Sequence, residues 1–369
     1  MSPSLAPDLR DLLALHLLPG LGPRLTAALL QRFGSAGAVL RAGAAQLRDV
    51  PHIGPKLSED LSQAMRSVDV DAELVLIAKH GVHLRRLGTP EYPAALAEIH
   101  DPPHLLYVRG TIQPADARAV ALVGSRQFTG YGRRAAERLA TELARAGYVI
   151  VSGLARGIDG IAHRAALQAG GRTLAVMAGG LSRIYPPEHA GLADEVAAAG
   201  ALVSEAPMKQ EPLAGMFPAR NRIISGLSRG VVIIEAAEKS GALITAEHAA
   251  EQGRTVFAVP GPIDNPSSAG TNALIREGAV LVRGADDVIE ELEGVRAPPG
   301  PSPARAVSPP PDLDDVQRRL WEFLGEGARH LDEMAQRLGL PVPPLTGALL
   351  TMEMKKLVRR LPGNRYERC

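Results

Sequence analysis

The chain has 369 residues, of which 46% are hydrophobic and 22% are charged, and none of its apolar runs is long enough to cross a membrane. We therefore expect two or three domains and no membrane partner. Lysine and arginine number 41 and acidic residues 40, a net charge of +1, so an anionic partner requires a local concentration of positive charge. The single cysteine, Cys369, excludes an internal disulfide and a cysteine-rich zinc site. The N-terminus lacks the layout of a secretory signal, which predicts a cytoplasmic protein.

The region from residue 8 to about 80 has apolar residues at helical spacing, which predicts a helical domain over residues 1–85. Two glycine turns within it, GLGPR (20–24) and HIGPK (52–56), resemble helix-hairpin-helix (SAM-like) motifs. The amides of such turns can contact a DNA phosphate. His52 replaces the first glycine of the second copy, where a left-handed backbone is less favourable. Duplex DNA binding and helix packing alone both stay open as roles for the two turns.

Between about 115 and 293, within a domain that we expect over residues 86–293, the pattern changes to short apolar runs that alternate with segments long enough for helices. The runs are AVALVG (119–124), YVIVSG (148–153), TLAVMAGG (173–180), ALVSEA (201–206), VVIIEAA (231–237), TVFAVPG (255–261) and AVLVRG (279–284). Parallel neighbours need crossover connections, so this alternation predicts an α/β fold with a doubly wound, mostly parallel, extended Rossmann-like sheet.

The C-terminal part begins after a proline-rich segment, residues 294–311, which contains seven prolines and predicts an extended linker. Three amphipathic segments follow within residues 312–369, at 313–324, 330–340 and 345–361, and a short RYE segment comes last. This pattern predicts a small winged-helix domain. A basic cluster near its end is consistent either with a solvated face or with nucleic-acid contact. The cluster comprises Lys355, Lys356, Arg359, Arg360, Arg365 and Arg368.

Glycine clusters follow several of the predicted strands. They are Gly124-Ser125-Arg126, Ser152-Gly153, Gly179-Gly180 and Ser240-Gly241. Ligands of open parallel sheets bind at the carboxyl ends of the strands, where glycine allows close approach to an anion and helix N-termini point their amides outward. The clusters therefore predict an anion-binding edge, although tight turns alone also select glycine. Complete dinucleotide and P-loop motifs are absent, so we expect neither NAD nor ATP as a cofactor.

The segment FPARNR (217–222) places an aromatic residue beside two arginines. A ring that stacks on bases and guanidinium groups that hold phosphates together suit single-stranded nucleic acid. The alternative is a core Phe217 with an arginine pair on a solvated helix face.

Seven segments in order carry a resemblance to the DNA-processing protein A (DprA/Smf) family. They are residues 92–110, 122–126, 152–163, 217–228, 235–249, 256–261 and 270–279. The resemblance implies a homodimer that binds and protects single-stranded DNA through the Rossmann-like domain. It further implies that the protein helps to load the RecA recombinase during natural transformation (competence) and recombination.

The resemblance also implies which residues contact DNA. Carried over by position, they are Ser125, Arg126, Gly153, Gly180, Phe217, Arg220, Asn221, Arg222, Ser240 and Gly241. Many family members have lysines where this chain has Pro187 and about Ala214. We expect Arg156, Arg183 or Lys209 to substitute for them, and we include Arg156 in the site.

The candidate groups of catalytic residues do not form a strong motif, so we expect a binding protein rather than an enzyme. Asp159 and His163 have helical spacing for two metal ligands, but no third ligand accompanies them and we expect no metal. Glu235 and Glu247 are candidates for paired carboxylates. The alternative function is that of a nucleoside-monophosphate phosphoribohydrolase, an enzyme group with a related fold, in which Arg220 or Arg222 would act with Glu247.

Overall fold

The computed structural model describes residues 5–294, 313–324, 329–355, 357–361 and 364–368. The chain divides into two compact units, residues 1–296 and 297–369. The predicted linker, residues 294–311, lies outside the described residues except for Gly294. The residues predicted as a helical domain, 1–85, fall in the first unit together with the sheet.

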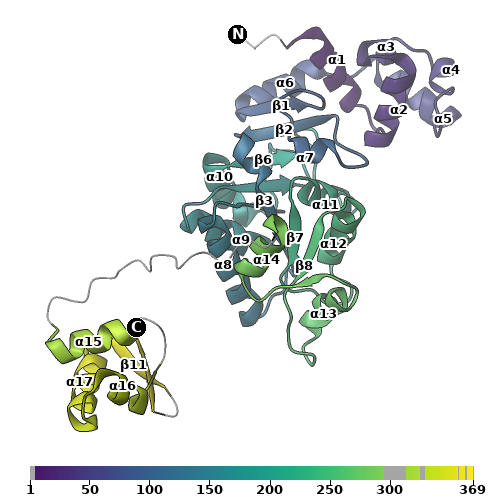
Figure 1. Ribbon diagram of the computed structural model, residues 1–369. Coiled ribbons are helices and arrows are strands. Elements are labelled where there is room, and N and C mark those ends of the chain that lie inside the picture. Colours follow the sequence, from purple (N-terminus) through teal and green to yellow (C-terminus); the bar gives the residue numbers. More distant parts are fainter. Residues whose placement is uncertain (1–4, 295–312, 325–328, 356, 362–363, 369) are drawn as a thin grey trace. The chain divides into compact units, whose positions relative to one another are not determined.

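The first unit contains a nine-stranded sheet in the order β1-β2-β6-β5-β4-β3-β7-β8-β9 (Figure 1). The strands are β1 Val82–Arg86, β2 Leu105–Gly110, β3 Ala119–Val123, β4 Val149–Ser152, β5 Thr173–Met177, β6 Ala201–Ser204, β7 Gly230–Ile233, β8 Thr255–Ala258 and β9 Val280–Leu281. All seven predicted strands are present, and β3 to β9 pair in parallel. The chain winds outward from β3 to β6 and then resumes on the other side at β7. This arrangement confirms the doubly wound sheet and places its switch point between β3 and β7.

Two strands were not among the predicted ones. β1 and β2 pair antiparallel with each other, and β2 pairs antiparallel with β6. All of β1 except Arg86 falls within the segment predicted as helical. Its sequence, VHLRR, contains only two apolar residues, Val82 and Leu84, and only Val82 is buried, so the segment carries little hydrophobic signal. Strand β1 forms because it pairs with the buried strand β2, although its own sequence does not favour a strand.

Helices cover both faces of the sheet, as Figure 1 shows. They are α7 Ala94–Ala97, α8 Gly130–Arg145, α9 Ile158–Gln168, α10 Ala190–Ala199, α11 Met216–Gly226, α12 Gly241–Glu251, α13 Ala269–Arg276 and α14 Ala285–Glu293, with 3-10 turns at Pro114–Ala117, Pro187–His189 and Pro266–Ser268. Alternate strand residues divide between two cores: Val120 and Leu122 pack with α8 and α9, whereas Ala121 and Val123 pack with α11 and α12. This alternation is expected for strands that are buried on both faces.

The N-terminal helices pack against the sheet and are hydrogen-bonded to a neighbouring loop. They are α1 Pro7–His16, α2 Pro23–Phe33, α3 Ala36–Leu40, α4 Ala44–Leu47, α5 Pro55–Ala64 and α6 Val70–Lys79. Their leucines share one core with Tyr107 of β2 and with α10. Two hydrogen bonds tie them to the segment between β6 and α11: Glu73 accepts from the Met208 amide at 2.7 Å, and His16 Nε2 donates to the Glu205 carbonyl at 2.8 Å.

The two glycine turns have nearly the same backbone. Gly20 and His52 both have positive φ, 81° and 69°. Gly22 and Gly54 then cap α2 and α5 in extended conformations, with φ of −90° and −80°. His52 therefore adopts the left-handed conformation that glycine adopts in the first copy, despite its Cβ. The two turns therefore repeat each other in backbone conformation as well as in sequence.

The second unit has the three-helix and three-strand pattern of a winged helix. Its elements are α15 Asp315–Phe323, β10 Arg329–His330, α16 Leu331–Leu338, α17 Val342–Met354, β11 Val358–Leu361 and β12 Arg365–Arg368. The predicted third helix, 345–361, was too long, because residues 358–361 form β11 and pair with β12. Within the predicted basic cluster, Lys356 lies outside the described residues and Arg359 pairs with Glu367.

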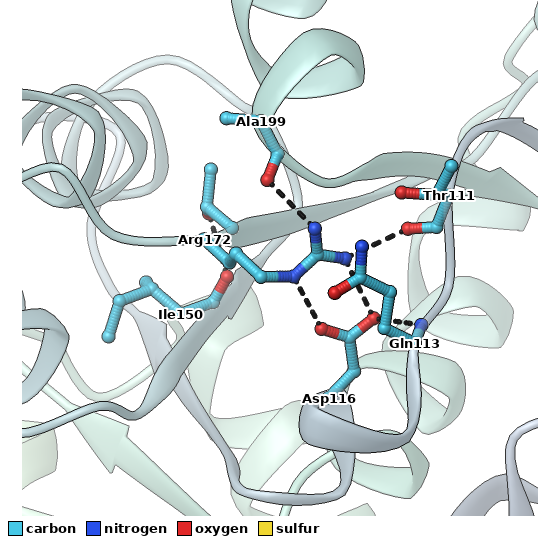
Figure 2. Close-up of polar contacts among 7 residues, drawn as sticks. Thr111, Gln113, Asp116, Ile150, Arg172 and Ala199 are labelled. Carbon is cyan, nitrogen blue, oxygen red and sulfur yellow. Dashed lines mark hydrogen bonds and ion pairs between the residues drawn. The ribbon is translucent and has the colours of Figure 1, made fainter.

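A partly buried ion pair joins the amino-terminal ends of strands, on the side of the sheet opposite the predicted site (Figure 2). Arg172, just before β5, binds both carboxylate oxygens of Asp116 at 2.9 and 3.0 Å. Its guanidinium also donates to the carbonyls of Ala199 and Thr111 at 3.1 and 3.0 Å. Asp116 in turn accepts from the Gln113 amide at 2.8 Å. The pair therefore connects the segments that lead into β3, β5 and β6.

We predict that Asp116→Ala lowers the free energy of unfolding by about 2 to 3 kcal/mol, because it leaves the Arg172 charge largely buried without its carboxylate. Thermal and urea unfolding measure the effect. The matched control is Glu137→Ala, which breaks an exposed pair with Arg133 on one helix and should cause no measurable change. Equal stability of the two variants would contradict the structural role of Asp116.

Candidate nucleic-acid interface

An open groove of about 590 Å³ lies at the switch point of the sheet; we call it the main groove. It is lined by residues 123–127 at the end of β3, by Ala155 and Asp159 after β4, and by the start of α12. Helix α11 contributes Phe217, Pro218, Arg220 and Asn221. Crevices at this position are the usual ligand sites of doubly wound sheets. A small hollow of about 20 Å³ adjoins it and shares Arg126, Phe217 and Arg220 with it.

The loop after β3 is held rigidly and presents Arg126 to solvent. The Ser125 amide donates to the Glu235 carbonyl at 2.8 Å, and the Ser125 hydroxyl accepts from the Gln127 amide at 3.0 Å. The Glu235 carboxylate accepts from the amide and hydroxyl of Thr129 at 2.9 and 2.6 Å, which fixes the start of α8. The Ser125 hydroxyl therefore shapes its own loop, while Arg126 faces the groove.

Phe217 is the aromatic centre of the site. The Arg126 guanidinium lies 5.1 Å from its ring centroid, and the Tyr185 ring lies 6.1 Å away at an angle of 59°. Arg156 lies 6.0 Å from the Tyr185 ring and pairs with Glu188 at 2.5 Å. Two half-exposed rings, each with a guanidinium beside it, thus line the hollow.

Arg220 differs from the expected solvent-facing arginine, because it is buried at 6% exposure. Its Nη1 donates to the carbonyls of Gly153 (2.7 Å) and Val176, and its Nε donates to the Asn221 side chain. Among the described residues it has no ion-pair partner, and its Nη2 donates no hydrogen bond. Burial lowers its pKa to about 10, so it stays charged at neutral pH.

Gly153 makes room for this cation. A Cβ at Gly153 would lie 2.6 Å from both terminal nitrogens of Arg220, which is too close for any side chain. The Gly153 amide meanwhile donates to Asp159 at 3.1 Å. Because Gly153 has no side chain, the guanidinium of Arg220 fits beside it.

Arg222 and Gly180 lie outside both the main groove and the hollow. Arg222 is buried and forms ion pairs with Glu205 at 2.5 Å and Asp101 at 3.5 Å. A Cβ at Gly180 would lie 2.0 Å from the Pro207 carbonyl, and its amide donates to the Gln210 carbonyl. Both residues hold the segment between β6 and α11 in place. We had expected both of them to face DNA.

The start of α12 completes the groove with Ser240 and Gly241. The Ser240 hydroxyl caps the helix by accepting from the Ala242 amide at 3.3 Å. Nothing lies within 4 Å of a Cβ built at Gly241, so space is open above the first turn. Asn221 connects this helix to α11 through a 3.3 Å hydrogen bond to the Gly241 carbonyl.

The candidate metal pair has other partners. Asp159 accepts from the amides of Gly153 and Ala155, and burial raises its pKa. His163 contacts the Thr173 hydroxyl at 2.6 Å, and burial lowers its pKa to about 3. No cluster of three metal-ligating side chains occurs in the described ranges.

The residues required by the phosphoribohydrolase alternative do not converge. Glu247 is exposed and does not line the main groove, Arg222 is held by acidic partners, and Arg220 donates to carbonyls. Glu235 serves as a partner of Thr129 rather than as half of a carboxylate pair.

Two contributors to the site were missed from the sequence. Tyr185 supplies the second ring, and the adjacent proline in its turn was the only signal. Gly157 has a φ of +85°, and a Cβ there would lie 2.3 Å from the Ser125 carbonyl, so glycine is required beside the Arg126 loop.

The two positions that lack the family's lysines can be located. Pro187 is in a 3-10 turn next to the Tyr185 loop, and Ala214 is exposed on the main groove. Of the expected substitutes, Arg156 and Arg183 line the hollow, although Arg183 pairs with Glu211 at 2.8 Å. Lys209 is exposed and lines neither the main groove nor the hollow.

No helix in the described ranges is both long and apolar enough to span a bilayer.

Comparison with known proteins identifies the family of the chain. A family model described as DNA recombination-mediator protein A matches residues 83–293, and one described as the DprA winged helix domain matches residues 303–364. Protein Smf of Escherichia coli is 42% identical over 299 residues, which cover 80% of this chain and 79% of that protein. DNA processing protein DprA of Bacillus subtilis is 45% identical over 220 residues, 59% of this chain and 74% of that protein.

Two solved structures are also similar. DNA processing protein A from Streptococcus pneumoniae has a TM-score of 0.67 at 36% identity, with 76% of this chain and 97% of that one covered. The corresponding protein from Helicobacter pylori, described for its single-stranded DNA binding mode, has a TM-score of 0.52 at 34% identity, with 57% and 96% covered. The chain therefore belongs to the DNA recombination-mediator protein A (DprA/Smf) family.

Proposed function

We propose that this protein binds single-stranded DNA in the main groove. The observation that carries the proposal is the meeting of Arg126, Phe217 and Arg220 at the switch point. Arg220 is a buried cation that forms no ion pair within 4 Å among the described residues. The Asp159 carboxylate acts on it only from beyond that distance, so a bound anion would stabilise the charge further. The name of the Helicobacter pylori structure, which refers to single-stranded DNA, supports the same ligand.

The chemistry of the groove favours an unpaired strand over a duplex. The rings of Phe217 and Tyr185 offer faces for stacking, and a base within a duplex already has stacked neighbours. The arginines and the amides at the start of α12 offer donors to the phosphates. We therefore expect a duplex of the same length to bind more weakly.

Family membership supports a role in DNA processing, and the finer role is part of the proposal. We infer that the protein acts in the cytoplasm as a homodimer, protects single strands and helps RecA to assemble on them during transformation and recombination. We also infer that it binds DNA without catalysing a reaction. The separation of Glu247 from the main groove supports this part of the proposal.

We predict that Arg126→Ala weakens binding of a labelled oligothymidylate about tenfold or more at low salt, because a charged hydrogen bond to phosphate is lost. The slope of log affinity against log salt should become shallower by about 0.7. Fluorescence anisotropy over a salt series measures both. The matched control, Arg145→Ala, removes the same charge from the last turn of α8 and should change neither. An unchanged slope in Arg126→Ala would contradict the phosphate contact.

We predict that Phe217→Ala costs about 1 to 3 kcal/mol of binding, the value of one stacked base, with little change in the salt slope. Phe217→Leu keeps an apolar side chain but has no aromatic face, so its affinity should resemble that of the alanine variant. Full affinity in Phe217→Leu would show that the ring only supports Arg126.

We predict that the protein sediments as a dimer and accelerates RecA assembly on single strands, and that Arg126→Ala reduces this acceleration in proportion to its loss of DNA affinity. Analytical ultracentrifugation and a RecA ATPase assay measure the two properties. Undiminished acceleration by Arg126→Ala would mean that the strand held in the main groove is not the one delivered to RecA.

A further inference from the structure

A second cavity, of about 380 Å³, lies between the first glycine turn and the sheet; we call it the hairpin pocket. Leu21 and Gly22 line it from the turn, and Met177 and Ile223 line it from β5 and α11. Its volume lies within the range of roughly 300 to 1,000 Å³ that is typical of ligand pockets. The proposed function does not use this cavity.

The hairpin pocket combines apolar walls with two neutral imidazoles and one carboxylate residue, Glu205, which is paired with Arg222. His104 lines it, and its buried Nδ1 has no partner among the described residues. His16 also lines it and donates from Nε2 to a carbonyl, which leaves Nδ1 as an acceptor. Burial lowers the pKa of both imidazoles, that of His16 to about 4, so both are neutral at neutral pH.

The hairpin pocket adjoins the proposed DNA path. Met177 and Ala178 line both this pocket and the hollow. Arg220 lines the pocket, the hollow and the main groove. The buried guanidinium therefore stands where the three cavities meet. A phosphate held by Arg220 would have its own nucleoside within reach of the pocket.

We propose that the hairpin pocket receives one unstacked nucleobase of the single strand whose phosphate Arg220 binds. The inference rests on the proposed function. Apolar walls suit the faces of a base, and neutral imidazoles suit its donor and acceptor edge, as in other sites that take a base out of the stack. The walls next to Arg220 place this base site beside a phosphate site, which favours a nucleotide over an apolar peptide.

A matched pair of glycine substitutions tests the proposal. Gly22 lines the hairpin pocket, whereas Gly54 occupies the same position in the second turn and lines a separate surface hollow. Both have extended backbones, and nothing lies within 4 Å of a Cβ built at either one. Gly22→Phe should therefore fill the pocket without strain, and Gly54→Phe controls for a bulky residue at the start of the helix.

The measurement is anisotropy with oligothymidylates of about eight nucleotides in which one abasic site is moved along the strand. In the unmodified protein we expect at least two positions where loss of the base weakens binding, by roughly 5- to 150-fold each. Phe217→Ala should abolish the sensitivity at one position and Gly22→Phe at another. Gly54→Phe should leave the scan unchanged.

The outcomes separate the two proposals. If every sensitive position depends on Phe217 alone, or if Gly22→Phe and Gly54→Phe give the same scan, the pocket takes no base although groove binding stands. If the protein binds no oligonucleotide, the proposed function fails first. Thermal unfolding shows whether Gly22→Phe folds. Ala219→Phe, which fills the pocket from the exposed side of α11, is the second variant and should remove the same sensitivity.

Discussion

The site is organised around one guanidinium group that is buried and has no ion-pair partner within 4 Å among the described residues. Removing the Arg220 cation from water is costly, and the chain offsets that cost with the carbonyls of Gly153 and Val176, at the carboxyl ends of neighbouring strands. Position 153 must be glycine for the guanidinium to fit, and Asp159 contributes a favourable field from the start of α9. The parallel sheet supplies this geometry, because the carboxyl ends of the neighbouring strands β4 and β5 present their carbonyls to the same small volume. Exposed groups such as Arg126 and Phe217 then surround a charge that the fold has already fixed in place.

Much of this arrangement could be predicted from the sequence. A continuous apolar run that ends in glycine indicates both a buried parallel strand and the turn that follows it. All seven strands, and the edge of the sheet that carries Arg126, were therefore placed correctly. The FPARNR segment also lies where an aromatic residue and a guanidinium meet. Local patterns succeed here because the period of a strand and the glycine of a turn are both encoded within a few residues.

The errors have one physical origin, which is that a side chain's partner can lie far away in the sequence. Arg220 and Arg222 look equivalent in the chain, yet Glu205 and Asp101 neutralise one, and strand carbonyls receive the other. Strand β1 forms because β2 pairs with it, although its own residues favour no particular structure. Strand β11 forms because β12 pairs with it, although its own residues favour a helix. Tyr185 joins Phe217 only after the loop that follows β5 has folded over the sheet edge.

The attachment of the N-terminal helices has a mechanical consequence. Glu73 on α6 and His16 at the end of α1 hold the backbone at Met208 and Glu205. These two residues belong to the segment that leads from β6 into α11, the helix that carries Phe217. A force applied to these helices would therefore reach the stacking ring through two hydrogen bonds and a short length of chain. A displacement of α1 or α6 would therefore shift the aromatic ring that lines the main groove, without any contact in the groove itself.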